Sequence, residues 1–97
     1  MSKVLFRVSY SIPDGKRPEY LAAVSKLQQH YRGTNIDYAV YETKGKHNHF
    51  QEVYVYPGIE AYEASDDPET LSGVSQHVDK IYALATNVTY DVSFEVA

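Results

Sequence analysis

The order of its periodic segments limits what this chain can fold into. The segment 88–96 alternates apolar and polar residues at every step, as a strand with one buried face does, and the segments 3–11, 36–43 and 49–56 are also predicted to be strands. Residues 18–31 and 71–85 instead repeat apolar side chains at helical spacing. The order strand, helix, strand, strand, helix, strand predicts an α+β fold with a four-stranded antiparallel sheet. Both helices are expected on one face, which leaves the other face uncovered.

Composition narrows the class of protein. A chain of 97 residues, 43% of them hydrophobic, is sized for one domain spanning 1–97. The net charge is −4 and no basic run exists, which disfavours nucleic-acid binding. No signal peptide and no apolar run of membrane length are visible, so we expect a cytoplasmic protein that does not contact membranes. Without cysteine, disulfides and thiolate chemistry are excluded.

The helical patterns predict which side chains form the core. In the first helix the expected buried stripe is Tyr20, Val24, Leu27 and Tyr31, with Leu21 alongside. The second helix is expected to start at the acidic, proline-containing segment 65–69. Its stripe comprises Leu71, Val74, Val78, Ile81 and Ala85, with Tyr82 at the edge. Gly73 falls inside this helix and weakens it slightly.

Strand alternation divides the remaining residues between two sheet faces. The helices should meet one set of side chains, namely Val4, Phe6, Val8, Val88, Tyr90, Val92, Phe94 and Val96. The opposite face carries Leu5, Arg7, Ser9, Thr89, Asp91, Ser93 and Glu95, and further tyrosines of the hairpin are expected there. This face has more aromatic area than a solvated surface needs, which predicts a homodimer formed through it. Arg7 is expected to pair with Asp91 or Glu95 across neighbouring strands.

Several titratable residues are candidates for chemistry. Glu52 and Tyr54 alternate on one strand face, where a buried carboxyl beside a hydroxyl suits proton transfer or a hydrogen bond at the dimer seam. His30 and His77 lie at the edges of the helical stripes. Each is either a candidate general base or a residue at the boundary of the core. His47 and His49 alternate as a metal-binding pair would, but a third ligand is missing, and an exposed loop is favoured.

Two stretches carry a resemblance to a known group. The segment Phe50-Gln51-Glu52-Val53-Tyr54-Val55-Tyr56-Pro57-Gly58-Ile59-Glu60-Ala61-Tyr62 has a Glu, one residue and an aromatic at the end of a strand, then a turn and a Glu-Ala pair. The final Val88-Thr89-Tyr90-Asp91-Val92 is similar to the last strand of haem-degrading relatives. Together with the order of elements, the chain resembles the dimeric α/β-barrel superfamily, in particular its antibiotic-biosynthesis-monooxygenase-like proteins.

This resemblance implies a ferredoxin-like protomer, a homodimer with facing sheets and a pocket between helices and sheet. It further implies an oxygenase that needs neither metal nor flavin and acts on a small aromatic or quinone-like molecule. His77, Glu52 and Tyr54 are then the candidate catalytic residues, and Arg7, Tyr62 and Tyr82 the candidate substrate-binding residues. The alternative is a dimeric assembly or ligand-binding module without catalysis.

The sequence also departs from the group. Haem-degrading relatives have an Asn, a Trp and a His at positions that fall on or near Arg7 or Val8, Ser65 and Ser75 here. None of the three matches, so haem degradation is not expected. Tyr62-Glu63-Ala64-Ser65 stands where relatives commonly carry a His after the Glu-Ala pair. The polar pocket set of the group is therefore incomplete in this chain.

Overall fold

The structure is a computed structural model that describes residues 2–66 and 73–97. Its strands are β1 (Val4–Ser11), β2 (Asp37–Glu42), β3 (His49–Tyr56) and β4 (Thr86–Phe94). Its α-helices are α1 (Arg17–Arg32), α2 (Ile59–Glu63) and α4 (Ser75–Leu84). Single 3₁₀ turns, η1 (Asp14–Lys16) and η2 (Ala64–Asp66), precede α1 and follow α2. None of the helices in these ranges has the length and apolarity to cross a membrane.

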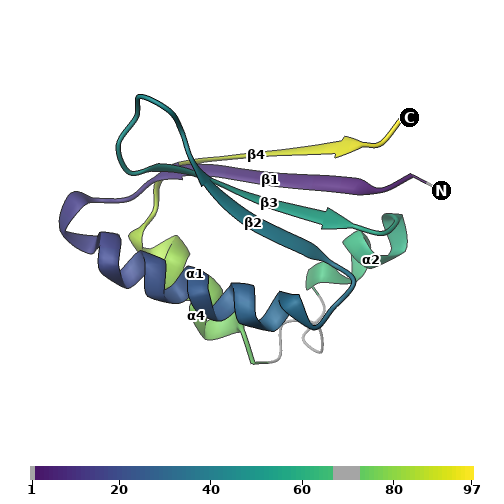
Figure 1. Cartoon of the computed structure of the whole chain (residues 1–97), viewed down its shortest axis with the longest axis horizontal. Helices are drawn as coiled ribbons and strands as arrows, with labels where there is room; N and C mark the ends of the chain where they lie inside the picture. The colour runs from purple at the N-terminus through teal and green to yellow at the C-terminus, as the bar shows by residue number, and fades with distance from the viewer. Residues whose placement is uncertain (1, 67–72) are drawn as a thin grey trace.

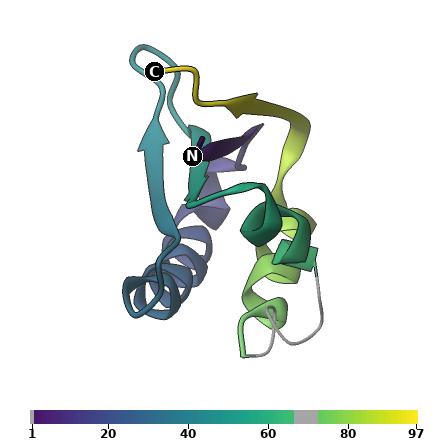
Figure 2. The same cartoon turned by 90° about the vertical axis from the view of Figure 1, so that its right-hand side faces the viewer.

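The four strands form one antiparallel sheet in the order β2-β3-β1-β4 (Figure 1). This confirms the predicted α+β, ferredoxin-like arrangement, including the expected pairing of β1 with β4. The α-helices all lie against the same face of the sheet. Figure 2 shows α1 on the β2 side and α2 with α4 on the β4 side. The register aligns Val8 with Glu52 on β3 and with Tyr90 on β4, so these three side chains share the helix-facing side.

Helix α1 supplies much of the core, as its periodicity predicts. Tyr20, Val24, Leu27 and Tyr31 are all buried against the sheet. Leu21, expected beside them, is 43% exposed and lies outside the core. The prediction for Leu21 was wrong because one residue after Tyr20 turns about 100° around the helix axis, beyond the width of the buried stripe.

The second long helix starts later than predicted. It begins at Ser75, and Gly73 precedes it with φ +86°, a left-handed conformation that a helix interior does not contain. Gly73 therefore belongs to the turn before α4 rather than to its interior. Val74 and Ile81 are buried and Val78 is half-buried, as expected. Leu71 and most of the predicted start segment lie outside the described residues.

Strand β4 does not contribute to the core as predicted. Tyr90 is 58% exposed, Phe94 is 59% exposed, and Val92 is also exposed. Val96 lies beyond the end of the strand and is almost fully exposed. β4 is an edge strand, and the described helices cover only the part of it around the half-buried Val88.

The hairpin tyrosines were predicted on both faces of the sheet, but most of them face the helices. Tyr54 and Tyr56 are buried there, and Tyr38 packs against the same core. Only Tyr41 of this group lies on the opposite face, where it is exposed. The face without helices, called the open face below, therefore carries less tyrosine than expected.

A polar clamp holds the β2–β3 hairpin against the start of α1. The Arg17 guanidinium donates to both carboxylate oxygens of Glu42, at 2.7 and 3.0 Å, and to Oδ1 of Asn48 at 2.7 Å. Asn48 is buried, has φ +61° and donates through Nδ2 to Asp14 at 2.7 Å. The Arg17 contacts lower the pKa of the Glu42 carboxyl to about 2. The clamp fixes the outer hairpin strand, and with it Tyr38, over α1.

Candidate functional site

A carboxyl group lies in the core between the sheet and the helices. Glu52 is on β3, which lies between β2 and β1 in the sheet. Glu52 is only 2% exposed. Its neighbours in register are Val8 on β1 and Val40 on β2, neither of which can accept or donate a hydrogen bond through its side chain. A buried carboxyl needs polar partners from elsewhere, because removing it from water is costly.

Tyrosine hydroxyls supply those partners. The Tyr38 hydroxyl donates to Oε2 of Glu52 at 2.6 Å, and the Tyr54 hydroxyl donates to the same oxygen at 3.3 Å. Tyr10 interacts with Glu52 as well, and its hydroxyl lies 2.8 Å from that of Tyr20. Among the described residues, no buried side-chain polar atom lacks a partner. The group of Glu52, Tyr10, Tyr20, Tyr38 and Tyr54 is called the tyrosine cage below.

Burial and the charge of Glu52 set the protonation states of the residues in the tyrosine cage. Burial raises the pKa of the Glu52 carboxyl, and the hydroxyls of Tyr38, Tyr10 and Tyr54 oppose that rise only in part. Burial and the nearby Glu52 charge raise the pKa values of Tyr10, Tyr38 and Tyr54 far above the ordinary value. The phenols therefore stay protonated, and Glu52 is the group of the cage that loses its proton at the lowest pH.

An aromatic cavity of about 300 Å³ adjoins the cage. The described residues that line it are Phe6, Tyr31, Tyr54, Tyr56, Ser65, Val78, Tyr82 and Tyr90. None of these carries a charge, and Phe6 stacks on Tyr90 with the ring centroids 6.0 Å apart. Tyr54 belongs both to this wall and to the cage, so it connects the cavity with the buried carboxyl. Such a space favours a planar, uncharged molecule.

The structure brings together four of the residues proposed from the sequence. Glu52 and Tyr54 are hydrogen-bonded, and Tyr82 lies in the cavity wall. Tyr62 on α2 packs behind that wall, with its ring 5.6 Å from the ring of Tyr56. Glu52 faces the helices rather than the open face, so it does not lie at a seam formed by that face.

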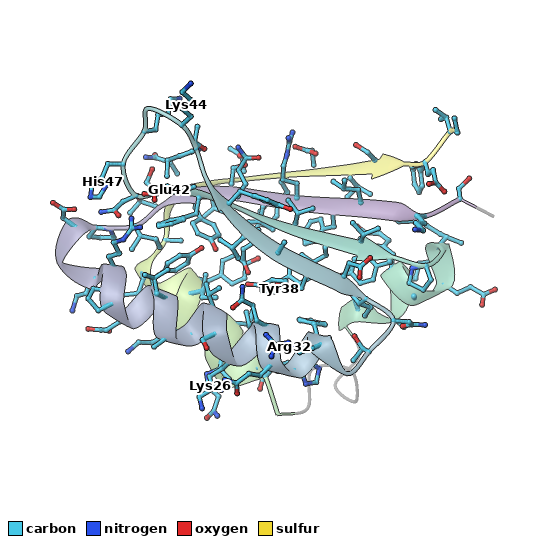
Figure 3. All side chains as sticks on the ribbon, viewed as in Figure 1. Lys26, Arg32, Tyr38, Glu42, Lys44 and His47 are labelled. Carbon is cyan, nitrogen blue, oxygen red and sulfur yellow. The ribbon has the colours of Figure 1, made fainter. Side chains whose placement is uncertain are left out.

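Arg7 and the histidines lie elsewhere. Arg7 is on the open face and donates to Asp91 at 2.7 Å, which confirms the expected charge pair. His77 lines a groove between α1 and α4 together with Lys26, whose side chain points away from the sheet (Figure 3). His30 packs edge-on against Tyr31 and does not line the aromatic cavity.

The histidines of the hairpin do not converge. His47 precedes β3 and contacts Asp14 at 3.0 Å, whereas Nδ1 of His49 lies 3.3 Å from the Ser11 hydroxyl. Asn48 between them is left-handed, which breaks the strand alternation that would place both on one face. Within residues 2–66 and 73–97, no three His, Cys, Asp or Glu side chains are grouped closely enough to hold a metal ion.

Sequence reasoning missed Tyr10, Tyr20, Tyr31, Tyr38 and Tyr90 as parts of the site. Tyr10 and Tyr38 occupy alternate strand positions that place them on the helix-facing side. That signal was present in the sequence, but the register that sets Tyr38 opposite Tyr54 depends on the hairpin pairing.

The fold and the cavity define a small ferredoxin-like protein with a tyrosine-lined pocket between helices and sheet. No family model matches the sequence, and no curated protein matches it either. Solved structures do match it. SnoaB from Streptomyces nogalater, a cofactor-independent oxygenase, aligns with a TM-score of 0.76 at 16% identity, over 100% of this chain and 96% of its own.

Two further solved structures also align with this chain over nearly its whole length. An antibiotic biosynthesis monooxygenase aligns with a TM-score of 0.72 at 18% identity, over 100% of this chain and 98% of its own. A conserved protein of unknown function from Bacteroides thetaiotaomicron aligns with a TM-score of 0.78 at 16% identity, over 97% and 98% of the two chains. The resemblance to antibiotic-biosynthesis-monooxygenase-like proteins is thereby confirmed at the level of the fold.

The raised pKa of Glu52 makes a stability prediction with a definite sign. The folded chain holds the Glu52 proton to higher pH than the unfolded chain, whose glutamate pKa is about 4.3. The stability that protonated Glu52 contributes is present below that pH and is lost as the pH rises through the folded pKa. In Glu52→Gln no such loss occurs at this position.

We therefore expect the free energy of unfolding of Glu52→Gln, minus that of the wild type, to increase above about pH 4.3, by at most about 1.4 kcal/mol per pH unit. Urea denaturation of both proteins from pH 4 to pH 8 measures this difference, in which the other titrating groups cancel. A difference that stays constant or decreases with pH contradicts the raised pKa.

Proposed function

We propose that this protein is a cofactor-independent oxygenase that acts on a small hydroxyaromatic or quinol-like molecule bound in the aromatic cavity. One observation carries the proposal: Tyr54 lines the cavity, and its hydroxyl donates to the buried carboxyl of Glu52. A proton acceptor is thus connected to an aromatic site whose described lining residues carry no charge.

The cavity fits such a ligand in size and in chemistry. About 300 Å³ is the lower end of the range for small-molecule pockets and holds one or two fused rings. Aromatic side chains such as Tyr56, Tyr82 and Tyr90 offer ring faces and edges for stacking. Without a charged residue among the described lining residues, the site does not favour an anionic ligand such as a phosphate ester.

The chemistry begins with loss of the ligand's hydroxyl proton. That proton passes through Tyr54 to Glu52, and the phenolate that remains is electron-rich enough to give electrons to dioxygen. For 1-naphthol, the oxidation by one O₂ yields 1,4-naphthoquinone and one H₂O, with four electrons passing from the ring to dioxygen. One oxygen atom becomes the second carbonyl, and the other leaves as water with the hydroxyl and ring hydrogens.

The similarity to SnoaB supports this proposal as an analogy of fold, since SnoaB is itself a cofactor-independent oxygenase. Of the catalytic candidates from the sequence, Glu52 and Tyr54 are retained. His77 is left out of the mechanism because it lies in the groove between α1 and α4. Tyr82 and Tyr62 are assigned to the cavity wall and its support, and Arg7 to the open face. A cytoplasmic location remains part of the proposal.

A second candidate function is a ligand-binding module without catalysis. The observation in its favour is that Glu52 is screened from the cavity by tyrosine and does not itself line it. In that case the carboxyl fixes the orientation of Tyr38 and Tyr54, and the aromatic walls bind a ligand that is released unchanged.

Oxygen consumption with 1-naphthol separates the two functions. We expect the wild type to bind 1-naphthol, to consume one O₂ per naphthol and to release 1,4-naphthoquinone. Tyr54→Phe and Glu52→Gln should lower kcat about 100-fold, because each removes a step of the proton transfer. His77→Ala is the control and should retain wild-type kcat. An oxygen electrode and calorimetric titration provide the two readouts.

The outcomes of this experiment are distinct. Binding without oxygen consumption supports the ligand-binding module and contradicts the oxygenase. Oxidation that is unaffected by Tyr54→Phe contradicts the assigned proton transfer. Absence of both binding and oxidation, across a panel of naphthols, quinols and quinones, contradicts both functions.

We also propose a homodimer formed through the open face. Leu5 on β1 pairs with Val55 on β3, Val53 is two residues from Val55 on the same face, and all three keep part of their apolar surface accessible. The Arg7–Asp91 pair borders this patch. A second sheet packed here would remove the apolar surface from water.

Light scattering tests the dimer. We expect a mass of two chains for the wild type at micromolar concentration and of one chain for Val55→Lys, which places a charge in the seam. Leu21→Lys is the matched control, since Leu21 is exposed on α1, and it should keep the mass of two chains. A wild-type mass of one chain rules out the dimer.

A further inference from the structure

The tyrosine cage contacts two separate hollows of the molecule. On one side, Tyr54 lines the aromatic cavity. On the other side, Tyr38 lines a second hollow of about 340 Å³ at the C-terminal end of α1, together with polar residues such as Gln28, Arg32 and Asp37. Tyr31 lines both hollows, so the cage and one tyrosine ring stand between them.

The two tyrosines meet at one atom. Both the Tyr38 and the Tyr54 hydroxyls donate to Oε2 of Glu52, at 2.6 and 3.3 Å, while their rings lie 4.9 Å apart between centroids. Figure 3 shows Tyr38 in the space between the sheet and α1, on the side where Arg32 lies. A series of hydroxyl, carboxylate oxygen and hydroxyl thus joins two tyrosines, one of which lines each hollow.

We propose that Tyr54, Glu52 and Tyr38 form a proton path from the aromatic cavity to the polar hollow at the end of α1. The path rests on the proposed function, because it provides the exit for the proton that the hydroxyaromatic ligand loses and the entry for the proton that returns when dioxygen is reduced to water. Tyr54 passes that proton to Oε2 of Glu52. The Tyr38 hydroxyl then turns from Oε2 toward water in the polar hollow, gives its own proton to that water and accepts the proton from Oε2, so Glu52 returns to the carboxylate with which the step began.

The path accounts for the hydrogen bond between Tyr38 and Glu52, which ligand binding in the aromatic cavity does not need. A carboxyl that exchanged protons only through Tyr54 could not exchange them with water while the ligand or product fills the cavity. The Tyr38 hydroxyl is a second hydrogen-bond partner of Glu52, and Tyr38 lines the polar hollow rather than the aromatic cavity. Tyr38 is therefore a positioning residue for proton transfer: it acts through Glu52 and does not line the aromatic cavity.

Tyr10 offers a matched control. It also interacts with Glu52, but its hydroxyl leads to Tyr20, and both residues are completely buried. Removing the Tyr10 hydroxyl therefore takes a polar partner from the same carboxyl without closing a route to either hollow. Each Tyr→Phe change keeps the ring and removes only the hydroxyl.

The test is the rate of proton exchange between the Glu52 carboxyl and water, measured by carbon-13 exchange NMR on the full chain. Each variant is measured at its own midpoint pH, and circular dichroism confirms that it is folded. Tyr38→Phe and Tyr54→Phe should each slow the exchange, and the double variant should slow it at least about tenfold beyond either. Tyr10→Phe should leave the rate close to that of the wild type.

The path is contradicted if Tyr38→Phe exchanges as fast as Tyr10→Phe, or if Tyr10→Phe slows the exchange as much as Tyr38→Phe does. This readout needs no turnover, so it separates the two proposals. The expected exchange pattern in a chain that oxidises no naphthol contradicts the oxygenase and keeps the path. Oxidation with a kcat unaffected by Tyr38→Phe keeps the oxygenase and contradicts the path.

Discussion

The burial of Glu52 under the helices is the constraint on which the other features of the core depend. A carboxyl removed from water is stable only with polar partners, and here the partners are tyrosine hydroxyls from both β2 and β3, with Tyr10 of β1 alongside. Each hydroxyl must reach the carboxyl from a ring that packs in the core. Leaving one such group without its partner costs about 1–3 kcal/mol, so the carboxyl restricts where each of these tyrosine rings can lie.

The same constraint explains why the aromatic cavity is close to a proton acceptor. Tyrosines that reach Glu52 place their rings side by side, as the 4.9 Å centroid distance between Tyr38 and Tyr54 shows. Of these rings, that of Tyr54 forms part of the cavity wall, and its hydroxyl provides the connection to the carboxyl. In the proposed function, the binding of an aromatic molecule and the removal of its proton thus both involve Tyr54.

Much of the fold could be predicted from the sequence because it depends on local patterns. The alternation in β1 and β3 and the stripe of α1 gave these elements to within a residue or two. The start of α4 was missed because it depends on the left-handed turn at Gly73. The exposure of Tyr90 and Phe94 was missed because alternation assigns residues to a face but does not say how far the helices extend over it. Glu52 and Tyr54 were identified from the family resemblance together with their alternate positions, whereas Tyr38 and Tyr10 required the register of three strands.

The pKa of Glu52 is the quantity that tests most directly whether this carboxyl is buried among tyrosine hydroxyls. Carbon-13 NMR of the side-chain carboxyl, with Glu52 assigned by comparison with Glu52→Gln, gives its pKa in the folded chain. The account expects a titration clearly above the ordinary glutamate value of about 4.3, and a further rise in Tyr38→Phe, which loses the hydroxyl that lies 2.6 Å from Oε2. A Glu52 that titrates at the ordinary value, with no response to Tyr38→Phe, would contradict the buried tyrosine cage and the functions built on it.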